Sequence, residues 1–350
     1  MKISMDNFKV RKFEMADYES YKSLFLKVYG YGISDNKFRK KNLDNPFSEG
    51  NPLIYLLLDG DRIIGANSFF PIEIFIEGTP FLGVQSGDSM ILREYRGMNL
   101  FRMILTYSIN ALSDMGYKFI VGLPNKDSHS GFLKLDFKSV DKLNVYSTVL
   151  NAKVSTRVQN SKFLTCVAKT GVINVWMNIV RGFSVYSELS VEFHNGFSNE
   201  MLKFIEKNEE RKNTRVNNCK EYLTWKYHEF NKGKYIIRKK DTKEIIAILI
   251  CSIHDNGTID ILDYFYDPAK GYNITNLINT FCRYIYDTKK NISRISIWSL
   301  NNYDVEVFRR YHGFSRTSED IYYIFKNLSM EEEIEGLKSL PISRGFSDIV

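Results

Sequence analysis

The sequence predicts an α/β protein with mixed sheets, built from two related units in tandem, and two observations carry this prediction. Strand-like and helix-like spacings of apolar residues alternate along the chain. The second half then repeats the order of elements of the first half, which indicates a duplicated topology. Because 44% of the 350 residues are hydrophobic and 25% are charged, each unit can bury a core of its own.

The first unit combines a hairpin with alternating strands and helices. Asp17 and Gly30 are residue types that begin and end a helix, and Asp59-Gly60-Asp61 is a typical hairpin turn. In order, the expected elements are a strand at 8–13, a helix at 17–28, hairpin strands at 53–58 and 62–70, a strand at 83–92, a helix at 100–115, a strand at 117–123, a short helix at 128–135 and a strand at 140–150.

The second unit shows a similar order of elements. They are a helix at 199–208, strands at 235–238, 245–253 and 259–266, a helix at 274–286, a strand at 294–300, a short helix at 305–311 and a strand at 320–325. We therefore expect units at 1–150 and 191–330, a linking segment at 151–190 with a helix at 172–183, and a tail at 331–350. A single irregular domain is the alternative.

Several function classes are not expected. The apolar run 245–253 is shorter than the roughly 20 residues of a membrane span, and the N-terminus has no apolar signal core, so we expect a cytoplasmic protein without a membrane partner. Four scattered cysteines predict neither a disulfide framework nor a metal site. The net charge of +7 is spread along the chain, so nucleic acid is not an expected partner. The oligomeric state stays open.

Residues 86–103, SGDSMILREYRGMNLFRM, predict a phosphate site. They form a strand that turns directly into a helix, and a helix N-terminus offers unpaired N–H groups and partial positive charge. Arg96 adds a charged donor, and Gly97 allows close approach of the backbone to a ligand. A solvated turn without a ligand is the alternative.

The same segment resembles motif A of the GNAT superfamily of acetyl-coenzyme A (acetyl-CoA) dependent acyltransferases, in which a strand leads to R/Q-x-x-G-x-G/A and a helix. Asn99 and Phe101 replace the two glycines, and asparagine tolerates left-handed backbone better than most residues. The resemblance implies that the pyrophosphate is capped by Arg96, Gly97, Met98, Asn99, Leu100 and Phe101, and that the pantetheine arm is lined by Met90, Ile91 and Leu92.

Residues 124–137, PNKDSHSGFLKLDF, resemble motif B of the same superfamily, N-x-x-A/S-x-x-x-Y/F-x-x-x-G-F. Asn125, Ser128 and Phe132 fit the pattern and become cofactor-binding candidates, whereas Asp136 stands where glycine is usual. The resemblance implies two strands that splay apart around the cofactor arm, which pairs with exposed main chain. In the second half, residues 267–273 lack the arginine and the glycines, so this copy is expected to be degenerate.

Acetyl transfer needs a base for the amine, and three residues are candidates for catalysis. Asp88 lies on the strand that leads to the cofactor turn and is either the base or a turn carboxylate. Ser128 and His129 are near the expected cofactor and are either catalytic or caps of the short helix. Phe132 stands where the family's tyrosine acid usually lies, and it cannot donate a proton.

The resemblance implies an N-acetyltransferase that moves acetyl from acetyl-CoA to a primary amine, and an amino sugar or its nucleotide-linked form is the preferred small-molecule acceptor. A Fem-type aminoacyltransferase and a non-catalytic CoA-binding or scaffold protein are the alternatives. One cofactor is expected per chain, and a fragment ending near residue 150 is expected to retain it. The run 222–227, YLTWKY, is similar to a signature of tandem GNAT proteins, and its aromatic residues are expected mainly to pack.

Overall fold

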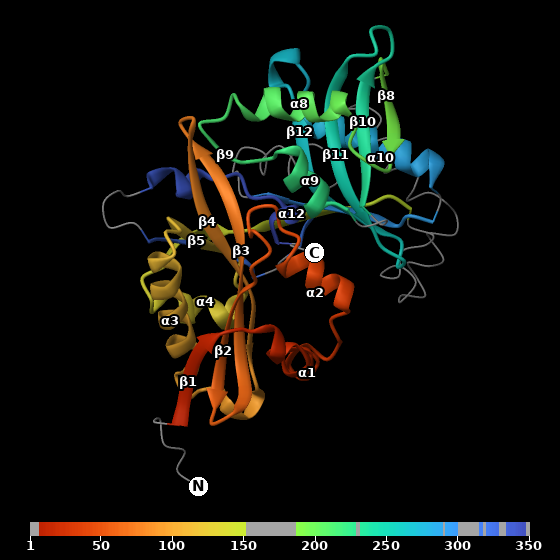
Figure 1. The fold of residues 1–350 in the computed structure, drawn as a ribbon. Coiled ribbons are helices and arrows are strands. Elements are labelled where there is room, and N and C mark those ends of the chain that lie inside the picture. Colours follow the sequence, from red (N-terminus) through yellow and green to blue (C-terminus); the bar gives the residue numbers. More distant parts are fainter. Residues whose placement is uncertain are drawn as a thin grey trace.

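The computed structural model describes residues 7–151, 187–228, 232–289, 291–299, 315–317, 320–328 and 334–347. Figure 1 shows these residues as two sheets with flanking helices, the first sheet in the lower part of the view and the second in the upper part. Each sheet combines antiparallel pairs with one parallel pair. This arrangement confirms the predicted α/β fold class. The expected helices at 172–183 and 305–311 lie outside the described residues.

The first sheet is built mainly from the first third of the chain. Its strands, in spatial order, are β1 (Phe8–Lys12), β2 (Leu53–Asp59), β3 (Arg62–Ile76), β4 (Thr79–Ile91), β5 (Phe119–Gly122), β15 (Tyr322–Asn327) and β6 (Lys138–Lys142), and β9 (Thr214–Val216) pairs with the far end of β3. Only β4 and β5 run parallel among these pairs. All of Leu53–Leu58 is buried, because the sheet is covered on both faces.

Helices cover this sheet on both sides, as Figure 1 shows for α1 and α3. They are η2 (Met15–Asp17), α1 (Tyr18–Tyr29), α2 (Asp35–Asn42), η3 (Arg93–Tyr95), α3 (Leu100–Asp114) and α4 (Lys126–Leu133). Gly30 ends α1 in a left-handed conformation, as expected. The sequence did not predict α2, because Phe38 is the one hydrophobic residue of its sequence DNKFRKKN and no periodicity can form.

The second sheet repeats the layout of the first. Its strands, in spatial order, are β14 (Ser315–Thr317), β7 (Asn144–Val149), β13 (Arg294–Ser299), β12 (Thr258–Tyr266), β11 (Ile245–Ile253), β10 (Lys232–Lys239) and β8 (Leu189–His194). The associated helices are α8 (Asn199–Glu209), α9 (Lys220–Lys226), η5 (Pro268–Lys270), α10 (Ile274–Thr288), η6 (Glu335–Ser339) and α12 (Arg344–Ser347). Among the described helices, none is long and apolar enough to span a membrane.

Each sheet contains a strand from the other half of the chain. β15 lies between β5 and β6 of the first sheet, and β7 lies between β13 and β14 of the second. The single strand expected at 140–150 is therefore two strands, with a crossing at Leu143, whose side chain is buried between the sheets. The boundary expected at residue 150 does not separate the sheets, because neither 1–150 nor 191–330 contains all strands of one sheet.

A shared hydrophobic cluster joins the two sheets. It combines Phe70 and Phe119 of the first sheet with Trp298 of the second, and the C-terminal segment 334–346 contributes five buried side chains. Trp225 of α9 belongs to the same cluster. Burial of this much apolar surface between the sheets favours one cooperative structure.

Candidate functional site

The first sheet opens beside β4. The parallel pairing of β4 with β5 extends from Val84–Ile120 to Ser86–Gly122 and then stops, whereas β4 continues to Ile91. At this point β4 bulges, since Asp88 and Ser89 oppose the single residue Asn67 of β3. Asp88 has a left-handed φ of 44°. From Gly87 onward no described strand pairs with this edge of β4, so an extended ligand can lie along it. The Ser89 and Ile91 carbonyls accept hydrogen bonds from the side chains of Tyr29 and Arg96.

The helix that follows β4 begins without a side-chain cap. Asn99 precedes α3 with a left-handed φ of 63°, as the sequence predicted for this glycine position, and its side chain does not cap the helix. Gly97 is also left-handed, and a Cβ there would meet nothing within 4 Å. Arg96 is exposed and donates from Nε to the Ile91 carbonyl at 3.1 Å. The first amides of α3 therefore remain open to an anion.

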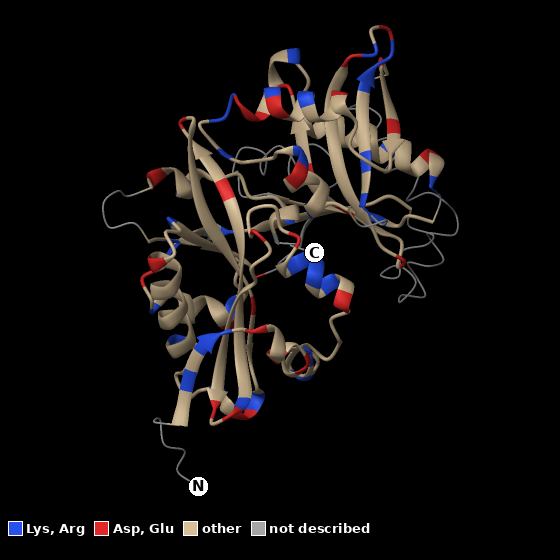
Figure 2. Ribbon diagram, in the orientation of Figure 1, with Lys and Arg blue, Asp and Glu red and all other residues tan. Residues whose placement is uncertain are grey.

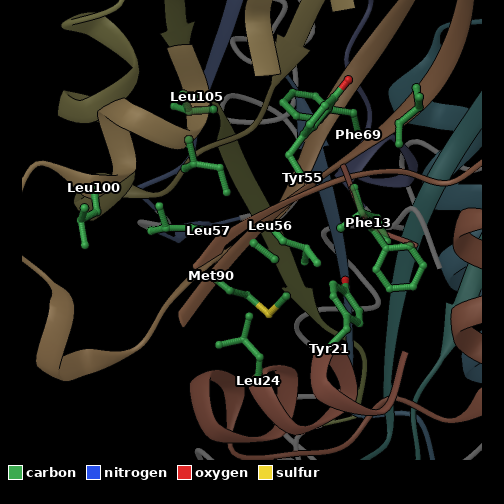
Figure 3. Packing of buried hydrophobic residues seen from close by; sticks show 14 of the residues in the cluster. Phe13, Tyr21, Leu24, Tyr55, Leu56, Leu57, Phe69, Met90, Leu100 and Leu105 are labelled. Carbon is green, nitrogen blue, oxygen red and sulfur yellow. The ribbon is translucent and has the colours of Figure 1, made fainter. Parts of the chain in front are cut away.

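The candidates for the pantetheine arm differ in their exposure. Met90 and Leu92 are buried in the core of the first sheet, where Figure 3 shows Met90 beside Leu24 and Leu56. Ile91 is only partly buried. Contacts from Met90 and Leu92 to an arm would therefore come from the main chain and not from their side chains. Of the expected pyrophosphate residues, Leu100 is likewise buried, and Met98 is partly buried.

The motif B residues form a capped and packed helix. The Asn125 side chain accepts from the amides of Asp127 and Ser128 at 3.1 Å each, so it caps α4. The Ser128 hydroxyl lies 3.0 Å from Asn125 Oδ1. Phe132 is buried and packs edge-on against Phe101, with ring centroids 5.3 Å apart. Asn125 therefore caps this helix, and the capping role expected of Ser128 and His129 is wrong, because both lie inside α4.

His129 and Asp136 have their own local roles. His129 Nε2 lies 3.0 Å from Ser139 Oγ, and its ring stacks on Tyr322 at 4.0 Å. Asp136 has a left-handed φ of 60°, which explains why the superfamily has glycine at this position. Among the described residues, no hydrogen bond or ion pair joins Asp88 to Ser128 or His129.

Asp88 pairs with a lysine that sequence reasoning missed. Lys41 Nζ lies 2.7 Å from the Asp88 carboxylate, and both side chains are 11% exposed. Lys41 stands in the last turn of α2, a helix with basic residues along most of its length in Figure 2. The signals that could have revealed this helix are the cap at Ser34 and the basic last turn.

Two tyrosines of α1, Tyr21 and Tyr29, lie close enough to Asp88 for its charge to act on them. Burial and the Asp88 charge both raise the pKa of Tyr21 well above its usual value, and they do the same for Tyr29. The Tyr21 hydroxyl lies 3.2 Å from Ser68 Oγ. Both phenols therefore stay protonated at neutral pH and do not act as bases there.

Two buried acceptor atoms near this site have no hydrogen-bond partner among the described residues. One is Oδ1 of Asn42, next to Lys41, and the other is Oε1 of Gln85 on β4. Gln85 donates through Nε2 to the Phe346 carbonyl at 2.7 Å. Because unsatisfied buried acceptors are costly, these oxygens favour a ligand or water that donates hydrogen bonds.

The second sheet retains the opening but not the anion site. β12 pairs with β13 only as far as Ile261–Ile297, and β12 bulges at Leu262. However, Asn273 caps α10 by accepting from the Thr275 amide at 2.8 Å. The buried carboxylate of Asp267 stands in the preceding turn and pairs with Arg211 at 2.6 Å. A capped helix start and a nearby carboxylate disfavour a pyrophosphate.

The C-terminal helix α12 fills this second opening. Arg344 pairs with Asp260 of β12 at 2.9 Å. A Cβ on Gly345 would lie 3.0 Å from the Leu262 carbonyl and 2.4 Å from the Tyr227 hydroxyl, so only glycine fits here. The second copy therefore has its own chain where the first copy has an open strand edge.

The comparison with protein families decides the identity of the first unit. Residues 9–133 match the model of the acetyltransferase (GNAT) domain. The first unit is thus similar to a GNAT acetyltransferase domain. The match extends from β1 to the end of α4 and includes motif A and residues 124–133 of motif B. Among curated proteins, none matches the chain.

Solved structures resemble both units of the chain together. A conserved protein of unknown function from Enterococcus faecalis V583, described as a probable N-acyltransferase, has 11% identity and a TM-score of 0.64 over 92% of this chain and 73% of its own. A GCN5-related N-acetyltransferase from Anabaena variabilis ATCC 29413 has 11% identity and a TM-score of 0.62 with the same coverage. Saccharomyces cerevisiae N-myristoyltransferase with bound myristoyl-CoA has 10% identity and a TM-score of 0.58 over 93% and 80%. At these identities the likeness shows the fold alone.

Proposed function

We propose that the chain transfers an acetyl group from acetyl-CoA to a primary amine. The observation that carries the proposal is the uncapped start of α3, with left-handed Gly97 and Asn99, directly after a β4 edge that β5 leaves free. The amides of this turn fit a pyrophosphate, and the free edge fits the amide groups of a pantetheine arm.

In the proposed reaction the amine nitrogen attacks the thioester carbonyl, and the carbon–sulfur bond breaks. Asp88 takes the proton from the amine, directly or through water, and the coenzyme leaves as a thiolate. Phe132 supplies no acid, and a thiolate is a good leaving group without one. Ser128 and His129 have structural roles, since Ser128 contacts the capping residue Asn125 and His129 contacts Ser139 of β6 and Tyr322 of β15.

The polar groups around Lys41 and Asp88 favour an acceptor rich in hydrogen-bond donors. Asn42 Oδ1 and Gln85 Oε1 accept no hydrogen bond among the described residues, and both side chains are 4% exposed. An amino sugar, free or linked to a nucleotide, offers hydroxyl and amine donors to such oxygens. This chemistry makes an amino sugar our proposed acceptor.

Two measurements test the proposal together. Calorimetric titration with acetyl-CoA, desulfo-CoA and longer acyl-CoA thioesters measures cofactor binding and acyl preference. Release of free thiol in a panel of amines, with glucosamine as the first amino sugar, measures transfer. A chain that binds acetyl-CoA but releases no thiol with any amine would be a coenzyme-binding protein, and one that binds free transfer RNA would favour the Fem-type alternative.

Arg96→Ala is expected to weaken acetyl-CoA binding by about 1.5 to 3 kcal/mol, because a charged hydrogen bond to the pyrophosphate is lost. This corresponds to roughly 10- to 100-fold in affinity, which calorimetry can measure. Arg93→Ala is the matched control, since Arg93 is also exposed and its side chain makes no hydrogen bond among the described residues. Equal affinities of the two variants would contradict the pyrophosphate assignment.

One acetyl-CoA is expected to bind per chain. The capped start of α10 and the Asp267 carboxylate disfavour a second pyrophosphate, and α12 fills the second opening. Calorimetry on the full chain measures this stoichiometry directly. Two equivalent sites, or a cofactor crosslinked only to the second sheet, would rule out cofactor binding by the first unit alone.

A further inference from the structure

The second unit contacts α2 at one specific backbone atom. The indole N–H of Trp225, in α9, donates to the carbonyl of Lys40 at 2.6 Å. Lys40 lies in the last turn of α2, where carbonyls have no partner within the helix. Trp225 is 6% exposed, and its ring packs against Tyr222 with centroids 5.5 Å apart. The donor of this hydrogen bond is therefore held in place by packing, and its acceptor is a carbonyl that has no partner within its own helix.

α2 depends on such anchors for its position. It has eight residues, a length at which an isolated helix is marginal in water. At its centre, Phe38 is buried among the rings of Phe13, Tyr18 and Tyr21. Trp225 contacts its C-terminal turn through the hydrogen bond to Lys40. The orientation of the helix is thus set by both units.

The residue after this anchor carries the ion pair. Lys41 follows Lys40 directly, and its Nζ lies 2.7 Å from the Asp88 carboxylate at the β4 bulge. A displacement of the last turn of α2 would move the ammonium away from Asp88. A continuous chain of contacts therefore leads from Trp225 through α2 to Asp88.

We propose that Trp225 is a positioning residue for acyl transfer. Its indole N–H fixes the last turn of α2 and so keeps the Lys41 ammonium beside Asp88. In this way the second unit sets the position of the Asp88 carboxylate in the first unit. This inference rests on the proposed function, because it gives Asp88 a part in the reaction. It also gives the YLTWKY run a role beyond packing.

Trp225→Phe tests the proposal because it keeps an aromatic ring and removes the N–H. With acetyl-CoA and glucosamine, or the best amine of the panel, kcat is expected to fall roughly three- to tenfold, the effect of one hydrogen bond. The Kd for acetyl-CoA should stay unchanged. Trp298→Phe is the matched control, since Trp298 is 5% exposed and its Nε1 has no hydrogen-bond partner among the described residues. Equal kcat values for Trp225→Phe and the wild type would overturn the proposal.

A double-mutant cycle separates positioning from general loss of packing. Because Trp225 is proposed to act through Lys41, the variant Trp225→Phe with Lys41→Met should be no slower than Lys41→Met alone. Additive losses of kcat would show that Trp225 acts by another route and would overturn the proposal. Lys41→Arg restores the charge and should recover part of the rate.

A labelling experiment tests the geometry without turnover. The rate at which an amine-reactive reagent modifies Lys41, measured by peptide mass spectrometry, should rise in Trp225→Phe and in Asp88→Asn but not in Trp298→Phe. An unchanged Lys41 rate in Trp225→Phe would overturn the inference even if no amine is acetylated. Absence of acetyl-CoA binding in the wild type would instead contradict the proposed function.

Discussion

Asp88→Asn is expected to slow acetyl transfer by about 10²- to 10⁴-fold and to leave acetyl-CoA binding intact, because a general base contributes about this much. Asparagine tolerates the left-handed φ of 44° at this position, so the bulge of β4 should persist. Its side-chain oxygen can still accept from Lys41, which keeps the ammonium partnered. The measurement is kcat by thiol release beside the acetyl-CoA Kd by calorimetry.

Asp136→Asn is the control for this variant. Asp136 also has a left-handed φ, of 60°, but is exposed and has no side-chain hydrogen bond among the described residues. Its amide variant should turn over at the wild-type rate. If Asp88→Asn also transfers acetyl at the wild-type rate, with an amine that the enzyme accepts and at several pH values near neutral, Asp88 serves only as the partner of Lys41. A loss of rate that accompanies a large fall in Tm would indicate a structural role.

A fragment of residues 1–151 is expected to lose acetyl-CoA binding and cooperative unfolding. It lacks β15, which pairs with both β5 and β6, so the strand beside the cofactor opening would have a free edge. β7 would have no sheet, and Phe70 and Phe119 would lose the cover of the shared cluster. Calorimetry and thermal unfolding measure both losses.

Coexpression with residues 187–350 provides the control for this fragment. The second piece supplies β15, β9 and the segment 334–346, so a copurifying pair should regain acetyl-CoA binding. If the fragment alone is folded and monomeric and binds acetyl-CoA with wild-type affinity, the first unit does not need β15 from the other half of the chain. That result would agree with the boundary near residue 150 that the sequence suggests.

Local signals in the sequence determined most of the elements and the turn between β4 and α3. The hairpin of β2 and β3 was predictable because a turn of Asp and Gly separates two apolar runs. The left-handed Asn99 was predictable because its neighbours match a pattern that has glycine there. These features depend on residues close together in the chain, and a sequence displays such neighbours directly.

Tertiary structure alone decided which distant segments meet. Nothing in the sequence places β15 between β5 and β6, because several apolar strands could pair there and only packing of the whole chain selects one. The ion pair of Lys41 and Asp88 joins residues 47 positions apart, and the Trp225 bond to Lys40 joins residues 185 apart. A helix with one hydrophobic residue has no periodic signal, so its position follows only from the rings around Phe38 and from the donor that Trp225 supplies.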